Sequence, residues 1–156
     1  MRQEKRNVFL LPLTARLVLL LIYLIILSYF LFFAEGFGRT GERTAFSVNL
    51  LPFKEIIRCF RFYDSLPKGF FLTNFVGNII AFIPFGFLFA SLLSYRKRFP
   101  LLLTVLVSAL LSATVELIQF FSRTGSCDID DVILNTLGGM TGYIIFYVLF
   151  VRKEKE

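Results

Sequence analysis

Four long apolar segments restrict the fold of this chain more than any other feature. They run over Arg16 to Phe33, Thr73 to Ser94, Pro100 to Phe121 and Val132 to Val151. A helix rises about 1.5 Å per residue and the hydrocarbon core of a bilayer is about 30 Å thick, so each segment is long enough to cross it. Hydrophobic residues make up 56% of the chain, far more than in a soluble domain. We therefore predict an all-α integral membrane bundle of four transmembrane helices, with residues 1–156 forming a single domain.

Lysine and arginine predict the orientation of these spans. Short cytoplasmic segments are enriched in both residues. Basic residues gather before the first span, between the second and third spans, and after the fourth: Arg2, Lys5, Arg6, Arg16, Arg96, Lys97, Arg98, Arg152, Lys153 and Lys155. We expect the N- and C-termini to be cytoplasmic, although the loop 34–72 carries six further basic residues. The formal charge of +6 then reflects membrane topology and needs no nucleic-acid partner.

An amphipathic segment lies in the loop between the first two spans. Phe53, Ile56, Ile57 and Phe60 recur at helical spacing, and charged residues occupy the other faces: Lys54, Glu55, Arg58, Arg61 and Asp64. The pattern predicts a short interfacial helix with Pro52 at its first helical position. Such a helix serves either as a lid packed over the bundle or as a surface that touches lipid headgroups, and the amphipathic pattern suits both roles.

Polar residues return near the end of the third span. Glu116, Gln119 and Arg123 are spaced i, i+3 and i+7, which predicts one stripe on the helix as it leaves the membrane. An ionisable side chain at membrane depth costs about 2.5–3.5 kcal/mol at a helix centre, and such residues commonly mark functional sites. Glu116 is therefore a candidate general acid or base. A structural hydrogen bond within the bundle is the alternative role for the same residue.

Three carboxylates follow where the fourth span begins, at Asp128, Asp130 and Asp131. A carboxylate at a helix N-terminus caps free amides, but capping explains only one of the three. Together with Glu116 they form an oxygen-rich set that could bind Mg²⁺ or Ca²⁺, although the spacing is not that of an EF-hand. The metal content and any other cofactor stay open at this point.

Amides and glycines complete the set of candidate residues. Asn74 and Asn78 lie one turn apart on one face of the second span, and they either hydrogen-bond neighbouring helices or join a polar pocket with Glu116. Asn135 follows one turn after Asp131. Gly138 and Gly142 form a small-xxx-small step, which favours close helix packing. The candidate ligand-binding residues are Asn78, Gln119, Arg123, Asp128, Asp130 and Asn135, with Glu116 and Asp131 as catalytic candidates.

Some chemistry is excluded by composition. The chain has no histidine, which excludes Ser-His-Asp catalysis and histidine-ligated zinc. Its two cysteines, Cys59 and Cys127, form no C-x-x-C motif. They either pair as a disulfide or stay as free thiols, because sequence does not show whether they approach.

Taken together, these residues resemble the VanZ-like family of small bacterial membrane proteins. The motifs that carry the resemblance are Asn49-Leu50-Leu51-Pro52-Phe53, Gly77-Asn78, Phe82-x-Pro84-x-Gly86, Glu116-x-x-Gln119, Arg123, Asp128-Ile129-Asp130-Asp131, Asn135-Thr136-x-Gly138-Gly139 and Gly142. The family's namesake is associated with low-level resistance to teicoplanin and related glycopeptides. The resemblance therefore implies a role in the cell envelope or in antibiotic tolerance, in the bacterial cell membrane, and does not by itself establish an enzyme.

Two hypotheses follow. In the first, an outward-facing polar pocket binds a membrane lipid or a lipid-linked cell-wall intermediate and so lowers glycopeptide access. In the second, the chain is a small intramembrane enzyme acting on a lipid or lipid-linked substrate, with Glu116 as acid/base and the aspartates orienting a metal or water. Replacing Glu116 by Gln separates them, because a proton-transferring site loses activity while a hydrogen-bond acceptor is preserved.

Overall fold

The computed structural model describes residues 11–33, 48–63, 71–93 and 100–151. Its elements, in chain order, are α1 (Leu13–Phe33), β1 (Val48–Asn49), α2 (Lys54–Arg61), the π-helical turn η1 (Leu72–Val76), α3 (Gly77–Leu92), α4 (Pro100–Ser122), β2 (Cys127–Asp128), α5 (Ile129–Phe146) and the π-helical turn η2 (Tyr147–Val151). Four helices are long and apolar enough to cross a membrane, and they begin at Leu13, Asn74, Pro100 and Ile129. The predicted all-α membrane bundle is confirmed.

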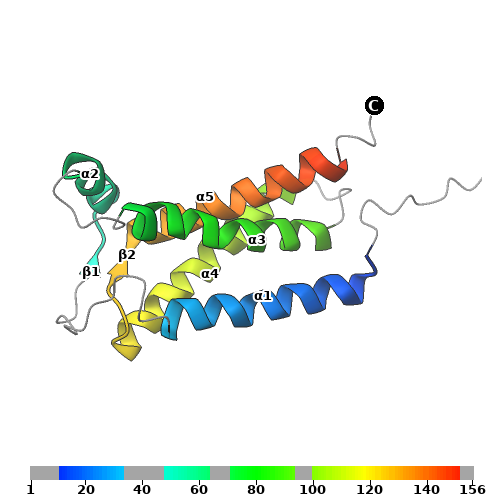
Figure 1. The fold of residues 1–156 in the computed structure, drawn as a ribbon, viewed down its shortest axis with the longest axis horizontal. Coiled ribbons are helices and arrows are strands. Elements are labelled where there is room, and N and C mark those ends of the chain that lie inside the picture. The colour runs from blue at the N-terminus through cyan, green and yellow to red at the C-terminus, as the bar shows by residue number, and fades with distance from the viewer. Residues whose placement is uncertain (1–10, 34–47, 64–70, 94–99, 152–156) are drawn as a thin grey trace, which may run out of the picture.

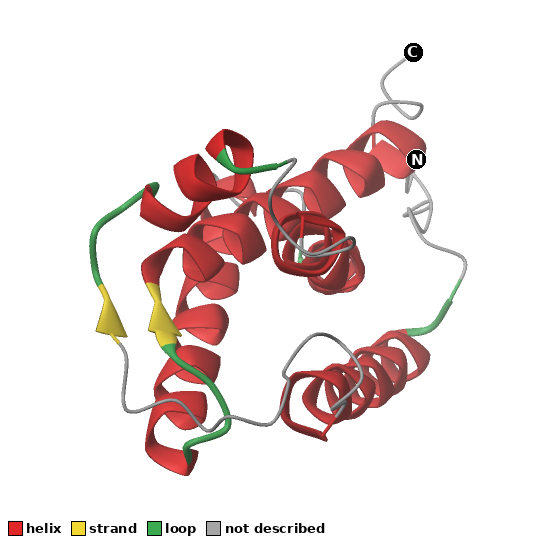
Figure 2. Ribbon diagram, turned by 60° about the vertical axis from the view of Figure 1, so that its left-hand side comes forward, coloured by secondary structure: helices red, strands yellow, loops and turns green. Residues whose placement is uncertain are grey.

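The four long helices run side by side, and the connections sort into two ends (Figure 1). At one end lie the start of α1, the end of α3, the start of α4 and η2. At the other end, here called the site end, lie the end of α1, both short strands, α2, the start of α3 and the start of α5. The two strands pair in parallel, with Val48 opposite Cys127 and Asn49 opposite Asp128 (Figure 2). Polar segments far apart in the chain therefore meet at the site end.

Glycines hold α3 and α5 in close contact. A Cβ at Gly138 would overlap the carbonyl group of Ile79, and one at Gly142 would overlap the carbonyl group of Ile83. A Cβ on Gly86 of α3 would in turn overlap the backbone of α5. The predicted packing role of the small-xxx-small step is confirmed, because only hydrogen fits where the two backbones touch.

Helix α1 packs on the outside of this core. Leu27 is buried against Phe82 and Phe85 of α3. The Tyr23 hydroxyl donates a hydrogen bond to the carbonyl oxygen of Ala81. Most of the other large apolar side chains of α1 are exposed on the surface of the bundle, as suits a helix in contact with lipid.

Several predicted boundaries differ from the structure. The fourth span begins at Ile129 rather than Val132, and the interfacial helix begins at Lys54 rather than Pro52. Both shifts follow from the aspartates described below, which cap these helices. Ser94 and Asp64 lie outside the described residues, as do all the basic residues used for the orientation except Arg16.

Candidate functional site

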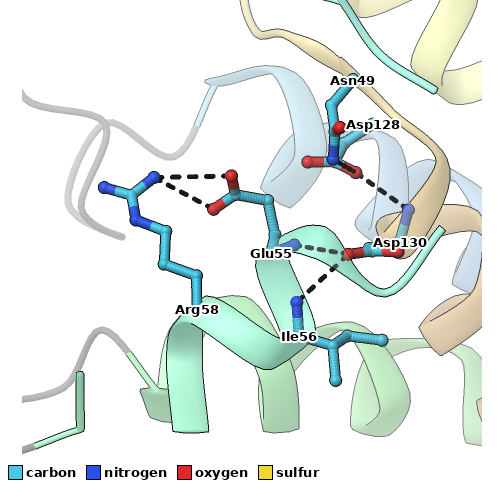
Figure 3. A network of polar contacts seen from close by, with 6 residues as sticks. All are labelled: Asn49, Glu55, Ile56, Arg58, Asp128 and Asp130. Atoms are coloured by element: carbon cyan, nitrogen blue, oxygen red, sulfur yellow. Dashed lines mark hydrogen bonds and ion pairs between the residues drawn. The ribbon is translucent and has the colours of Figure 1, made fainter. Parts of the chain in front are cut away.

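The Asp130 carboxylate joins α5 to α2 at the site end. It is 1% exposed and accepts three backbone hydrogen bonds, from the amides of Phe53 (2.5 Å), Glu55 (2.7 Å) and Ile56 (3.1 Å). Figure 3 shows the contacts with Glu55 and Ile56. The first amides of a helix have no partner within it, and the helix dipole favours an anion there. Asp130 thus caps a helix that lies 75 residues earlier in the chain, rather than its own.

This long-range cap explains where α2 begins. Phe53, at the N-cap position, has a φ of 66° and no capping side chain of its own. A bulky residue with positive φ is uncommon and persists only where its surroundings fix it. Here the backbone turn brings three amides onto one carboxylate, so α2 begins at Lys54 and Pro52 falls in the preceding turn.

Asp128 caps α5 and also binds β1. Its Oδ1 accepts hydrogen bonds from the Asp130 amide (2.9 Å) and from Nδ2 of Asn49 (3.0 Å) (Figure 3). Burial raises the pKa of this carboxyl above its ordinary value, and the negative charges of Asp130 and Glu55 raise it further. The two hydrogen bonds act in the opposite direction by stabilising the ionised form.

Asp128, Asp130 and Asp131, at and just before the start of α5, are here called the aspartate layer. Glu116 of α4 lies next to this layer. The side chain is 3% exposed, and its Oε2 accepts a hydrogen bond from the Asp128 amide at 3.0 Å. Gln119, one turn on, is equally buried and donates from Nε2 to the carbonyl oxygen of Leu31 at 3.0 Å. Glu116 therefore positions the loop before α5, and Gln119 holds the end of α1.

Arg123 does not continue the stripe that the sequence predicts. Helix α4 ends at Ser122, and Arg123 has a left-handed backbone with a φ of 59°. The carbonyl oxygen of Gln119 accepts hydrogen bonds from the amides of Thr124 and Gly125, which closes the helix. The i+7 spacing fails because the helix stops first, and Arg123 is exposed on the surface.

The two predicted asparagines find partners on neighbouring helices. Asn78 of α3 donates from Nδ2 to Oδ1 of Asp131 at 2.6 Å. Asn135 of α5 donates from Nδ2 to the Ser112 hydroxyl of α4 at 2.8 Å. Asn78 thus supports the aspartate layer, whereas Asn135 lies deeper in the bundle and joins two spans.

A cavity of about 410 Å³ lies between α2 and the aspartate layer. Its lining includes three of the candidate residues: Asp128, Asp130 and Asp131. The remaining lining residues are Val48, Asn49, Lys54, Glu55, Ile56, Arg58, Cys59, Asn74, Phe75, Ser126 and Leu134. Glu116, Gln119, Arg123, Asn78 and Asn135 are not among them. The structure therefore separates the candidates into residues that line the cavity and residues that support or lie away from it.

The sequence predicts α2 as a lid or a lipid-facing surface, but it does not show that α2 lines a cavity with the aspartates. The face with Glu55, Ile56 and Cys59 turns toward the bundle, and Cys59 is buried. Ile57 and Phe60 are exposed. The amphipathic pattern identified the helix, but no local feature showed that its polar residues would cover the aspartates. Helix α2 therefore covers the aspartates, as the lid role predicts. Its exposed apolar residues are compatible with the other predicted role, contact with lipid headgroups.

The carboxylates do not converge on a common point. Among the described residues, no group of three or more His, Cys, Asp or Glu side chains is arranged to hold a metal ion. Asp130 is directed at backbone amides, and Glu116 at the Asp128 amide. Cys59 and Cys127 are both free thiols, so the disulfide alternative is not realised.

Comparison with known proteins places this arrangement in a family. The family model described as VanZ/LLP1 matches residues 20–150, which include the second and third spans, most of the first and fourth, and Asp128, Asp130 and Asp131. The chain belongs to the VanZ/LLP1 family. It is also similar to Protein VanZ of Enterococcus faecium, with 42% identity over 71 residues, or 46% of this chain. That match spans 42% of the length of the Enterococcus protein. No solved structure is significantly similar to the chain.

Proposed function

We propose that this VanZ/LLP1 protein binds a membrane lipid headgroup or a lipid-linked cell-wall component in the cavity beneath α2, and thereby raises tolerance to teicoplanin-type glycopeptides. The observation that carries the proposal is the cavity itself. Small-molecule sites in proteins commonly measure about 300–1,000 Å³, and this one measures about 410 Å³. Its lining combines charged and amide side chains with a few apolar ones, as suits a headgroup joined to a chain.

The position of the cavity supports a ligand from the membrane. It lies at the end of the spanning helices, where headgroups lie in a bilayer. Leu50, Leu51, Phe53, Ile57 and Phe60 are exposed beside it on α2 and the turn before α2. Exposed apolar and aromatic residues at this depth favour insertion among lipid headgroups.

The predicted orientation would place the cavity outside the cell. Three basic segments attach to the chain at the start of α1, between α3 and α4, and after η2. All three points of attachment lie at the end of the bundle opposite the cavity (Figure 1). A positive-inside arrangement thus faces the cavity toward the cell wall, where a lipid-linked cell-wall component and a glycopeptide would both be met.

The alternative, a small intramembrane enzyme with Glu116 as acid/base, has weaker support. A general acid or base must come within hydrogen-bond reach of the substrate, directly or through one water. Glu116 does not line the cavity, and Asp128 lies between the two. Glu116 has the contacts of a positioning residue, so binding is the better-supported function.

The proposal is tested in a susceptible Gram-positive host that expresses the wild type or a variant, with membrane levels matched by blot. Lys54→Gln and Asp131→Asn change the charge of cavity-lining residues. Arg61→Gln is the control, since Arg61 is on the same helix but does not line the cavity. We expect the wild type and Arg61→Gln to raise the inhibitory concentration of teicoplanin, and the two cavity variants to lose that effect.

Two results would contradict the proposal. A wild-type chain that leaves the inhibitory concentration unchanged removes the link to glycopeptide tolerance. Cavity variants that remain as active as Arg61→Gln remove the link between tolerance and the cavity.

A further inference from the structure

The cavity has two walls of opposite charge. One wall is α2, which contributes Lys54, Glu55 and Arg58. The other is the start of α5 with the residue before it, which contributes Asp128, Asp130 and Asp131. The walls are held at a fixed separation by the Asp130 contacts with the α2 amides. A ligand between them meets basic groups on one side and carboxylates on the other.

Internal contacts decide which charges face a ligand on the α2 wall. Glu55 pairs with Arg58, its carboxylate oxygen lying 3.1 Å from the guanidinium nitrogen (Figure 3). This pair partly neutralises itself. Lys54 makes no ion pair with any residue that the structure describes. Its ammonium is therefore the principal positive charge offered by this wall, and ammonium groups bind phosphate as point charges.

Internal contacts also decide which carboxylates face a ligand on the other wall. Asp130 directs both oxygens at backbone amides, and Asp128 directs one oxygen at two donors. Asp131 is half-buried at the cavity, with Oδ1 held by Asn78. A carboxylate oxygen accepts more than one hydrogen bond, and an anchored one meets a cation without losing side-chain freedom. Asp131 thus offers a fixed negative charge to the ligand.

We infer that the cavity selects a zwitterionic headgroup that carries a phosphodiester and a primary ammonium, as in phosphatidylethanolamine. The phosphate lies beside Lys54 on α2, and the ammonium lies against Asp131 on α5. This inference rests on the proposed function and names the class of ligand for the same cavity. An anionic headgroup would satisfy Lys54 and be repelled by the aspartates, whereas a quaternary ammonium has no N–H to donate to Asp131.

The test uses the full chain purified in a mild detergent. Its affinity for phosphatidylethanolamine, phosphatidylcholine and phosphatidylglycerol with identical acyl chains is measured by native mass spectrometry titration. A charge-assisted hydrogen bond contributes about 1.5–3 kcal/mol, so we expect phosphatidylethanolamine to bind about tenfold more tightly than either of the others. Asp131→Asn should abolish this preference, and Lys54→Gln should weaken all three lipids. Arg61→Gln should match the wild type.

Melting of each variant without lipid, followed by circular dichroism, shows that it is folded before its affinity is compared. Equal affinity for the choline and ethanolamine lipids, or tighter binding of phosphatidylglycerol, overturns the zwitterion inference. If Lys54→Gln still weakens every lipid in that case, the cavity binds phospholipid headgroups and the proposed function stands. If no lipid responds to Lys54→Gln and teicoplanin tolerance is also unaffected, both proposals fail.

Discussion

Asp130 Oδ2 lies 2.7 Å from the amide nitrogen of Glu55, although 75 residues separate the two in the chain. The contact fastens the extramembrane helix α2 to the start of a transmembrane helix. A polar loop and a membrane span are thereby made into one structure around the cavity.

Asp130→Ala should release α2 from the bundle. The variant leaves three helix amides without their acceptor, and loss of such a cap costs about 1–3 kcal/mol. Hydrogen exchange at Phe53, Glu55 and Ile56 should become about tenfold faster or more. Asp131→Ala is the control, because the three amides donate to Asp130 whereas Asp131 accepts from Asn78 of α3. Unchanged protection of α2 in Asp130→Ala would show that other contacts hold the helix.

Asp128→Asn should preserve the fold and flatten its pH dependence. Burial raises the pKa of the Asp128 carboxyl, so ionisation is harder in the folded chain than in the unfolded one. Its contribution to stability is therefore fully present at low pH and falls as pH rises through the folded pKa. Asn keeps an oxygen that can accept from Asn49 and from the Asp130 amide. Melting temperatures measured in detergent from pH 4 to pH 7 should fall less in the variant than in the wild type, and an equal or steeper fall would contradict this assignment.

Glu116→Gln and Glu116→Ala should behave differently. The Gln side chain keeps an oxygen that can accept from the Asp128 amide, whereas Ala leaves that amide without this partner. We expect Glu116→Gln to retain teicoplanin tolerance and Glu116→Ala to lose stability by about 1–3 kcal/mol. Inhibitory concentration and detergent melting measure the two effects. Complete loss of tolerance in a stably folded Glu116→Gln would favour the enzyme alternative over the positioning role.

Gly138→Ala should separate α3 from α5. The added methyl overlaps the Ile79 carbonyl group, which is backbone and cannot turn aside. Overpacking of this kind costs about 1–3 kcal/mol. Gly125→Ala is the matched control, since its nearest neighbour would be the Gln119 Cβ at an ordinary 3.5 Å. Thermal melting should show a lower transition for Gly138→Ala alone. Equal melting temperatures of the two variants would contradict this prediction, because the added methyl would then fit between α3 and α5 without loss of stability.

The orientation prediction is tested by labelling single cysteines in whole cells with a membrane-impermeant maleimide. Both native cysteines are first replaced by serine. Thr124→Cys lies in an exposed turn at the site end, and Leu11→Cys lies at the opposite end. Labelling of position 124 alone is the expected result. Labelling of position 11 alone would place the cavity in the cytoplasm and remove the proposed access to the cell wall.

The membrane architecture can be predicted from the amino-acid sequence. Length and hydropathy are enough to predict a span, because a helix is one of the few structures that satisfy all backbone polar groups inside a bilayer. The four-residue spacing of Gly138 and Gly142 places both on one helix face and predicts their role in close helix packing. The amphipathic pattern of Ile56, Ile57 and Phe60 likewise predicts the helix α2 from local sequence.

Which polar residues lie together depends on how the helices pack. The sequence predicts that Glu116, Arg123 and the aspartates form one group, and the fold divides them. Arg123 does not share a helix face with Glu116 because α4 ends at Ser122. Glu116 accepts a hydrogen bond from the Asp128 amide and does not line the cavity. Lys54 lines the cavity because Asp130 binds the first amides of α2 and so fixes the position of this helix. Hydrogen bonds between residues 12 to 79 positions apart set this geometry. Such contacts produce no periodic pattern in the sequence, so they cannot be predicted from it.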